Sequence, residues 1–278
     1  MLYICATPIG NLEDITLRAI NILNKSDIIL CEDTRRSHIL FNYHNIKPKK
    51  VVSLHEHNEN EVTNKVIEWL EQDLIITQIS DAGTPGISDP GSRLCNRITK
   101  LGFKISPLPG PCSFISLLSV SGINSPFTFY GFLPSQKNQR MKFLCSLKEN
   151  EYPICVFESP HRIIECLNDI HTVFGDNCSV LLGRELTKQF ETIKKLNIIN
   201  LIEFVKSDLN QQKGEFVLII EPVIEIDEEL TNQQIMSIKT LLTELPPKKS
   251  VNLTHKLFGG NKDKLYKFAI STNINSKI

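Results

Sequence analysis

Residues 74–92 read LIITQISDAGTPGISDPGS, and this stretch decides the fold. The apolar run 74–79 predicts a buried strand, and three glycines, two prolines and two aspartates follow it in residues 80–92. Such a loop leaves backbone N–H and C=O groups without ladder partners, and its small residues let a ligand approach the main chain. Because open α/β sheets bind ligands where their strands end, we interpret residues 80–92 as a binding loop rather than a plain surface connection.

On both sides of this loop, short β-branched runs alternate with helical patterns, which is typical of an α/β protein. Strands are expected at 2–6, 27–30, 51–54 and 103–106, and helices at 16–24, 59–72 and 92–101. A second series follows, with strands at 127–132, 154–158, 179–183 and 215–221 and a helix opening at Ser159-Pro160. The segment 106–113, SPLPGPCS, separates the two series because proline ends central strands.

The sequence therefore predicts an α/β fold of two α/β domains, 1–112 and 113–225, followed by a small helical basic tail, 226–278. Charge is uneven along this plan, although the 31 basic and 31 acidic residues balance overall. Residues 231–278 carry eight lysines against Glu244 and Asp263, a balance of +6. Neutrality argues against a uniformly positive nucleic-acid-binding surface, but the tail is a candidate for meeting an anion.

The spacing of the cysteines and the first residues of the chain indicate the cellular compartment of the protein. The eight cysteines are never closer than ten residues, so C-x-x-C metal or redox motifs are absent, and a reducing compartment is the simpler interpretation. The first basic residue is Arg18, and no apolar run approaches the ~18 residues of a spanning helix. We expect a cytoplasmic protein without a membrane segment.

The glycines exclude the commonest nucleotide-binding motifs. No two of the thirteen lie two residues apart and none precedes lysine, so the sequence contains neither G-x-G-x-x-G nor a Walker A loop. Other motifs do lie at strand ends: ATPIGNLEDITLRA (6–19), PLPGPCSF (107–114), CEDTRRSH (31–38), SLHEH (53–57), ESPHR (158–162) and GRELTK (183–188). The charged motifs place carboxylates beside Arg, His or Lys, as proton transfer and phosphate binding require. His55 and His57 lack a third metal ligand at suitable spacing, so no metal is expected.

Taken together and in this order, the motifs resemble the tetrapyrrole methylase superfamily and, within it, the family of small-subunit ribosomal RNA methyltransferases. The match runs from Tyr3 to Glu221 and includes FYGFLP and GEFVLIIE. The resemblance implies a class III methyltransferase fold, with a donor cleft between two α/β domains, and a homodimer. It also implies S-adenosylmethionine-dependent, metal-free methylation of a cytidine 2′-oxygen in the decoding region of 16S rRNA, free or within the small ribosomal subunit. The sequence departs from the family pattern at Cys112, Ser135, Phe157 and Phe190.

The motifs supply three sets of candidate site residues. A ribose hydroxyl needs a proton acceptor, for which the candidates are Asp33, His55 and Glu158. RNA phosphates are expected on Arg35, Arg36, Arg162, Arg184 and Lys188. The donor is expected on Pro8, Gly83, Thr84, Pro85, Gly86, Ile87, Cys112 and Ser113.

Two other functions remain open from sequence. A methyltransferase of the same superfamily could act on a tetrapyrrole or a protein acceptor, although CEDTRR, HEHNE and ESPHR weigh against this. A non-catalytic RNA-binding module would bind RNA through the tail without binding a methyl donor.

Overall fold

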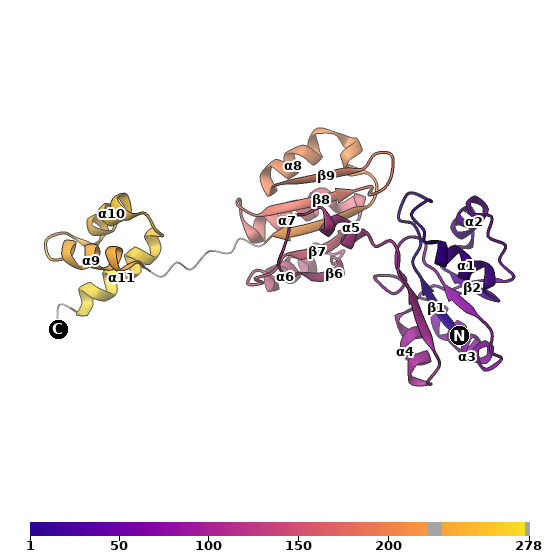
Figure 1. Cartoon of the computed structure of the whole chain (residues 1–278). Coiled ribbons are helices and arrows are strands. Elements are labelled where there is room, and N and C mark those ends of the chain that lie inside the picture. Colours follow the sequence, from indigo (N-terminus) through magenta and orange to yellow (C-terminus); the bar gives the residue numbers. More distant parts are fainter. Residues whose placement is uncertain (222–229, 276–278) are drawn as a thin grey trace. The chain divides into compact units, whose positions relative to one another are not determined.

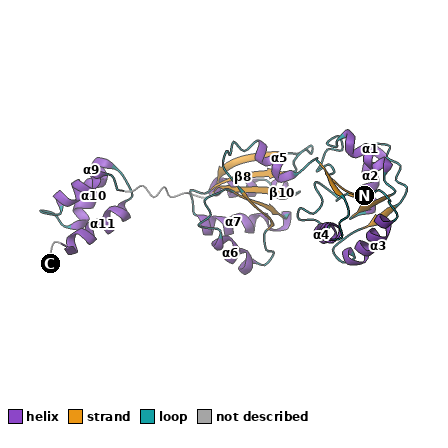
Figure 2. Ribbon diagram, turned by 60° about the horizontal axis from the view of Figure 1, so that its bottom comes forward, coloured by secondary structure: helices purple, strands orange, loops and turns teal. Residues whose placement is uncertain are grey.

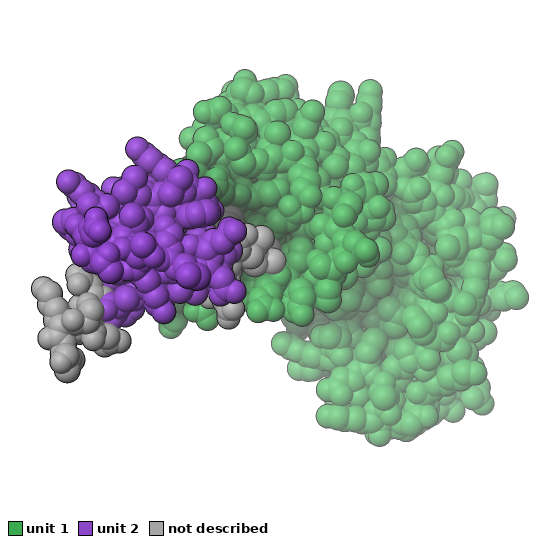
Figure 3. All heavy atoms as spheres, turned by 60° about the vertical axis from the view of Figure 1, so that its left-hand side comes forward, with its two compact units in different colours: residues 1–223 green, residues 224–278 purple. Residues whose placement is uncertain are grey.

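The computed structural model describes residues 1–221 and 230–275. The chain forms two compact units, Met1–Val223 and Ile224–Ile278, which Figure 3 shows in different colours. The first unit contains two five-stranded sheets and the second contains helices (Figure 1). The predicted boundary at 225/226 lies outside the described residues, and the one at 112/113 stays a prediction.

The first sheet is parallel and has the strand order β3-β2-β4-β1-β5. Its strands are β1 (Leu2–Cys5), β2 (Ile28–Cys31), β3 (Val51–Ser53), β4 (Ile76–Gln78) and β5 (Ile105–Leu108). The helices between them are α1 (Leu17–Lys25), α2 (Thr34–Tyr43), α3 (Glu59–Glu71) and α4 (Ser92–Lys100). Each predicted strand and helix of this half is present, with its ends shifted by a few residues.

Alternation along the strands divides the core of this half into two layers. Ile28 and Leu30 pack with residues of α3 and α4, whereas Ile29 and Cys31 pack with residues of α1 and α2. Successive side chains of a strand point to opposite faces, so an apolar run such as residues 28–31 serves both layers. The helices consequently cover both faces of the sheet (Figure 2).

Strand β5 continues through Pro107, where the sequence predicted that the strand had already ended. Pro107 lies opposite Ile4 of β1, and β5 is the last strand of its sheet. An edge strand tolerates proline because one side of it needs no N–H donor. The strand therefore ends at Leu108, directly before the PGPCS turn.

The second sheet is mixed, in the order β6-β7-β10-β8-β9, with only β6 and β7 parallel. The strands are β6 (Thr128–Phe132), β7 (Ile154–Glu158), β8 (Ser179–Arg184), β9 (Thr192–Asn197) and β10 (Phe216–Glu221). The helices are α5 (Ser113–Ser119), α6 (Lys137–Ser146), α7 (Ile163–Phe174) and α8 (Ile198–Ser207), with 3₁₀ turns at Pro160–Arg162 and Leu209–Gln212. Residues of α6, α7 and α8 pack on one face, and α5 contributes to the core on the other.

The sequence analysis did not predict helices α5, α6 and α8 of this half, and two further local features also differ from it. The edge strand β9, TIKKLN, was missed because its adjacent lysines hide the strand pattern, although charges of this kind protect an exposed edge. Ser159 precedes a 3₁₀ turn rather than an α-helix, and its side chain makes no capping hydrogen bond.

The second unit has three helices among its described residues, α9 (Asn232–Leu241), α10 (Pro247–Phe258) and α11 (Lys262–Asn275). Its core contains Ile238, Val251, Leu265 and Ala269. Thr231 and Gln234 form a capping box that begins α9, and Pro246 and the glycine pair at 259–260 separate the helices. A small helical region after the two α/β halves is what the sequence predicted. Within the described ranges, no helix is long and apolar enough to cross a membrane.

Candidate active site

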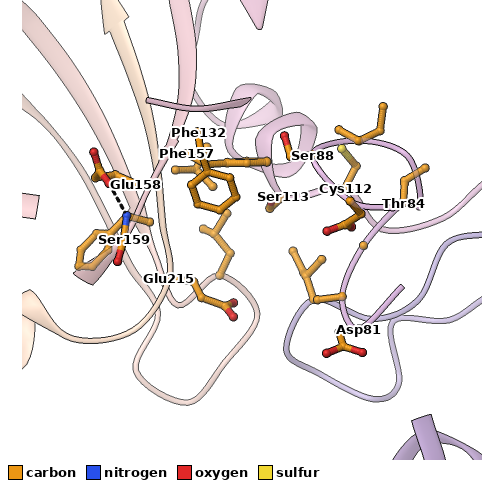
Figure 4. Close-up of a pocket in the computed structure, with 18 of the residues that line it drawn as sticks. Asp81, Thr84, Ser88, Cys112, Ser113, Phe132, Phe157, Glu158, Ser159 and Glu215 are labelled. Atoms are coloured by element: carbon orange, nitrogen blue, oxygen red, sulfur yellow. Dashed lines mark hydrogen bonds between the residues drawn. The ribbon is translucent and has the colours of Figure 1, made fainter. Parts of the chain in front are cut away.

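A cavity of about 440 Å³ opens where strands of both sheets end (Figure 4). From the first sheet it is lined by residues of the loops after β1, β2, β4 and β5. From the second sheet it is lined by the ends of β6 and β7, the segment after β8 and the start of β10. This is the edge at which α/β sheets hold small molecules, and the volume is in the range of a small-molecule site.

The loop after β4 takes a conformation that ordinary residues rarely adopt. Gly83 and Gly86 have φ angles of +78° and +79°, and Ser88 has 63°. The N–H and C=O of Gly83 both hydrogen-bond to Thr7, at 2.9 Å each. Thr84 Oγ1 donates to the carbonyl of Pro111 at 3.0 Å. These bonds join the loops after β1, β4 and β5 into one wall of the cavity.

The predicted donor residues therefore lie close together in the fold. Gly83, Thr84, Ile87, Cys112 and Ser113 line the cavity, and Pro85 and Gly86 belong to the same loop. Pro8 lines a smaller cavity of about 210 Å³, which shares Ile9, Asp81 and Ala82 with the larger one. Their role toward a donor stays a prediction.

The far end of the loop is fixed by Glu59, a buried residue at the start of α3. Its Oε1 accepts the backbone N–H groups of Gly91, Arg93 and Leu94, at 3.1 Å each, and so caps α4 from another helix. A carboxylate at a helix N-terminus satisfies orphan donors and favours the helix dipole.

We expect Glu59→Ala to destabilise the protein by about 1–3 kcal/mol, because two buried backbone donors and one partly buried donor lose their acceptor. Thermal unfolding followed by circular dichroism measures this loss. Glu61→Ala is the matched control, since Glu61 lies on the same helix in an exposed ion pair with Lys65 and its removal should change little. Equal unfolding temperatures for the two variants would contradict the anchoring role of Glu59.

Three carboxylates line the cavity on the side of the first sheet, Glu32, Asp81 and Asp89, with Arg36 beside them. Burial raises the pKa of Asp89 to about 6, and the negative charge of Glu32 adds to the rise. Burial also raises the pKa of Glu32, helped by the charge of Asp81. Asp81 accepts the backbone N–H of Asp33 at 2.9 Å and pairs with Arg36 at 3.3 Å. A carboxylate whose pKa is raised holds a proton more readily, as a general base must.

Sequence reasoning pointed to the neighbours of these carboxylates and missed the carboxylates themselves as proton acceptors. The available signals were the two aspartates in the loop 80–92 and the glutamate that precedes Asp33 in CEDTRRSH. Neither pattern indicates which carboxyl group the fold buries.

Asp33 caps helix α2 and lines an open pocket that also contains Arg35. Its carboxylate accepts the backbone N–H of Arg35 and forms two bonds with the Arg35 guanidinium, the shorter at 2.7 Å. These bonds lower the pKa of Asp33 to about 2. Its carboxylate is therefore a weak proton acceptor at neutral pH.

His55 and Glu158 lie in different surroundings. His55 is half-buried after β3, its ring centroid is 5.9 Å from that of His57, and its buried Nδ1 has no hydrogen-bond partner in the described part of the chain. Glu158 lines the cavity and is buried, with Oε1 accepting from the N–H of Ser159 at 2.6 Å and from Arg162 at 2.7 Å. Figure 4 shows its carboxylate beside the Ser159 nitrogen. Of the three predicted acceptors, Glu158 alone lines the cavity.

The predicted RNA-binding cations are spread around the site. Arg35 is exposed beside Asp33, and Arg36 and Lys188 both line the smaller cavity. Lys188 also pairs with Glu185 and Glu215. Arg162 pairs with Glu158, and the buried Arg184 donates to the carbonyls of Lys213 and Phe190. Through these bonds Arg184 connects two loops. Contact of the five cations with RNA stays a prediction.

A metal site is not evident. Within residues 1–221 and 230–275, no three His, Cys, Asp or Glu side chains are grouped so as to hold a metal ion.

Residues 1–201 match the family model for Tetrapyrrole (Corrin/Porphyrin) Methylases. The chain is 42% identical over 274 residues to a protein of Haemophilus influenzae named Ribosomal RNA small subunit methyltransferase I, covering 98% of this chain and 96% of the relative. It is 41% identical to the protein of that name from Pasteurella multocida, with 97% and 96% covered. The chain belongs to the ribosomal RNA small subunit methyltransferase I family. The predicted family and its enzymatic class are confirmed.

A solved structure shows that this methyltransferase family shares its fold with more distant enzymes. The structure of a cobalt precorrin-4 methyltransferase of cobalamin biosynthesis matches 78% of this chain and 93% of its own, with a TM-score of 0.58 and 16% identity. The chain is thus a methyltransferase with the tetrapyrrole methylase fold, as predicted.

Proposed function

We propose that this chain transfers a methyl group from S-adenosylmethionine to the 2′-oxygen of a cytidine in the decoding region of 16S rRNA. The observation that carries the proposal is the cavity in which the loop 80–92 and a carboxylate of raised pKa line one site. The names of the relatives, which match nearly the whole chain, supply the substrate class, small-subunit ribosomal RNA. We also propose a homodimer in the cytoplasm, acting on rRNA within the small ribosomal subunit.

The cavity fits the proposed donor. Its wall combines apolar side chains, such as Ile9, Ile87 and Leu186, with main chain at Gly83 that carries no side chain. When bound, S-adenosylmethionine supplies a methyl group on a sulfonium, which an aligned oxygen attacks in line. The carboxylates of Asp81 and Asp89 favour a cationic ligand, and the apolar wall excludes water from it. This arrangement supports donor binding.

The acceptor hydroxyl must lose a proton, and Asp89 is the group best suited to take it. Asp89 lines the cavity, and its pKa of about 6 leaves it mostly ionised at pH 7 while giving it more affinity for a proton than an exposed aspartate has. Asp33, the alternative from the sequence, is committed to Arg35 and to the cap of α2. Oε1 of Glu158 is committed to Arg162 and Ser159, while its buried Oε2 has no hydrogen-bond partner within the described residues, and we propose that Glu158 positions the end of β7.

Mass analysis of rRNA nucleosides tests the proposal. Small subunits lacking the modification are incubated with the protein and methyl-labelled S-adenosylmethionine, and the digested 16S rRNA is searched for 2′-O-methylcytidine. Appearance of that nucleoside at one position is the expected result. Base methylation alone, labelled protein or tetrapyrrole, or RNA binding without donor binding would each overturn it.

The basic helical unit is proposed to add phosphate contacts. Replacing Lys248, Lys249 and Lys256 by alanine should weaken small-subunit binding mainly at low salt, because each phosphate contact releases counterions. The expected salt slope falls by up to about three. The control replaces Lys47, Lys100 and Lys104, which are exposed lysines of the first unit. Equal salt slopes for the parent and both triple variants would show that Lys248, Lys249 and Lys256 do not contact RNA.

A further inference from the structure

Phe132, the last residue of β6, exposes a large apolar ring at the cavity. It lines the cavity, yet 58% of the residue is accessible to solvent. Exposed apolar surface rimmed by polar groups marks ligand-binding grooves, and here carboxylates and serines line the same cavity. Figure 4 shows Phe132 beside Phe157, on the wall that the second sheet supplies.

A series of contacting aromatic rings packs against Phe132. The ring centroids of Phe132 and Phe157 are 5.4 Å apart, and their planes meet at 61°. The ring centroids of Phe157 and Phe129 are 5.2 Å apart. Phe129 in turn stacks on Phe114 at 4.2 Å. Aromatic contacts of this kind stabilise ring orientation, so the partly exposed Phe132 ring has little side-chain entropy left to lose when a ligand packs on it.

A β-bulge sets the position of this ring. The pairing of β6 with β7 shifts between Phe129 and Gly131, which leaves Tyr130 as the extra residue. Gly131 has φ +70°, and a Cβ there would lie 2.5 Å from Ser88 Oγ of the loop 80–92. Bulges re-aim side chains near active sites. The end of β6 therefore packs directly against the proposed donor loop.

We propose that the exposed face of Phe132 stacks on the base of the acceptor nucleotide, drawn out of the RNA into the cavity. The inference rests on the proposed function and goes beyond it by naming the group that holds the base. Proteins that recognise single-stranded RNA hold splayed-out bases by stacking them on aromatic side chains, which replaces the stacking lost within the RNA. The loop 80–92, with Asp81 and Asp89, comes from the first sheet, so the ring on the opposite wall is left for the acceptor.

Two rRNA fragments test the proposal. Both carry the nucleotide that the parent enzyme methylates, and in one of them that nucleotide lacks its base but keeps its ribose hydroxyls. Single-turnover methylation is titrated against each fragment, and calorimetry measures S-adenosylmethionine affinity separately. The variants are Phe132→Ala, Phe132→Tyr and the control Phe190→Ala, which removes a ring that is 69% exposed outside the cavity lining.

Phe132→Ala should weaken binding of the intact fragment by roughly 5- to 150-fold, which is the range for losing one stacked base. Phe132→Tyr and Phe190→Ala should stay near the parent, and the base-less fragment should bind Phe132→Ala and parent alike. Equal losses on both fragments would assign Phe132 a structural role and overturn the proposal. If Phe132→Ala instead lowers S-adenosylmethionine affinity, the ring contacts the adenine of the donor, and this result would also overturn the proposal. Failure of the parent to methylate whole small subunits would count against the proposed function, not against the ring.

Discussion

Asp89→Asn is expected to slow methyl transfer by roughly 100-fold or more when donor and RNA both saturate, because an amide cannot accept the hydroxyl proton. Asparagine keeps the shape of aspartate, so both ligands should still bind. Single-turnover rates at saturation measure the chemical step, and calorimetry measures donor affinity. A rate within a few fold of the parent would remove Asp89 from the mechanism.

The pH profile of the same step gives an independent test. The acceptor role needs the ionised form, and the pKa of Asp89 is about 6. The parent rate should therefore rise about tenfold per pH unit below pH 6 and level off above it. Asp89→Asn should lose this inflection.

Glu32→Gln should move the inflection in a known direction. The negative charge of Glu32 raises the pKa of Asp89, so removing that charge lowers the pKa and shifts the inflection to lower pH. Asp81, with Arg36 paired to it, also faces this cavity and remains in the variant. An inflection that stays in place would show that the titrating group is not coupled to Glu32.

The sequence candidates are ranked by the same assay with Asp33→Asn, His55→Ala and Glu158→Gln. Asp33→Asn should reduce RNA affinity rather than the saturated rate, because it releases Arg35. A large loss of saturated rate in one of these variants, with Asp89→Asn near the parent, would identify that residue as the acceptor.

The sequence predicted the fold well where local patterns decide it. Apolar runs such as residues 28–31 determine buried strands directly, and glycine and proline mark the loop 80–92. Strand β9 was missed because its residues fit an exposed edge better than a core. Each of these outcomes depends on neighbours in sequence.

The choice of proton acceptor depends on neighbours in space, and sequence could not supply it. Asp89 acquires its raised pKa from burial and from Glu32, which lies on the loop after another strand. Arg35 lowers the pKa of Asp33. The closeness of the two residues in sequence suggested a catalytic cluster, but in the fold they form an ion pair. Arg184 likewise has a basic side chain at a strand end, yet the packing of β8 buries it against loop carbonyls.

Gly83→Val is expected to lower S-adenosylmethionine affinity by roughly 100-fold, equal to about 2.7 kcal/mol of binding free energy. Gly83 has φ +78°, where a β-branched residue is strained, and it lines the cavity. A Cβ would lie 3.4 Å from Ile9 Cγ2, so the two further methyl groups of valine would extend into the proposed donor space or displace Ile9. Calorimetry with the folded variant measures the loss.

Backbone strain alone could also weaken binding by loosening the protein, and Gly102→Val separates the two effects. Gly102 has φ +79°, nearly the same backbone angle, but nothing lies within 4 Å of its added Cβ, and it belongs to the turn after α4 rather than to the cavity. Both variants should lose comparable stability, since both force a branched residue into the left-handed region. Only Gly83→Val should lose donor affinity. Equal donor affinities in two folded variants would place the donor elsewhere than on the loop 80–92, whereas a loss confined to Gly83→Val would tie the donor to this wall of the cavity.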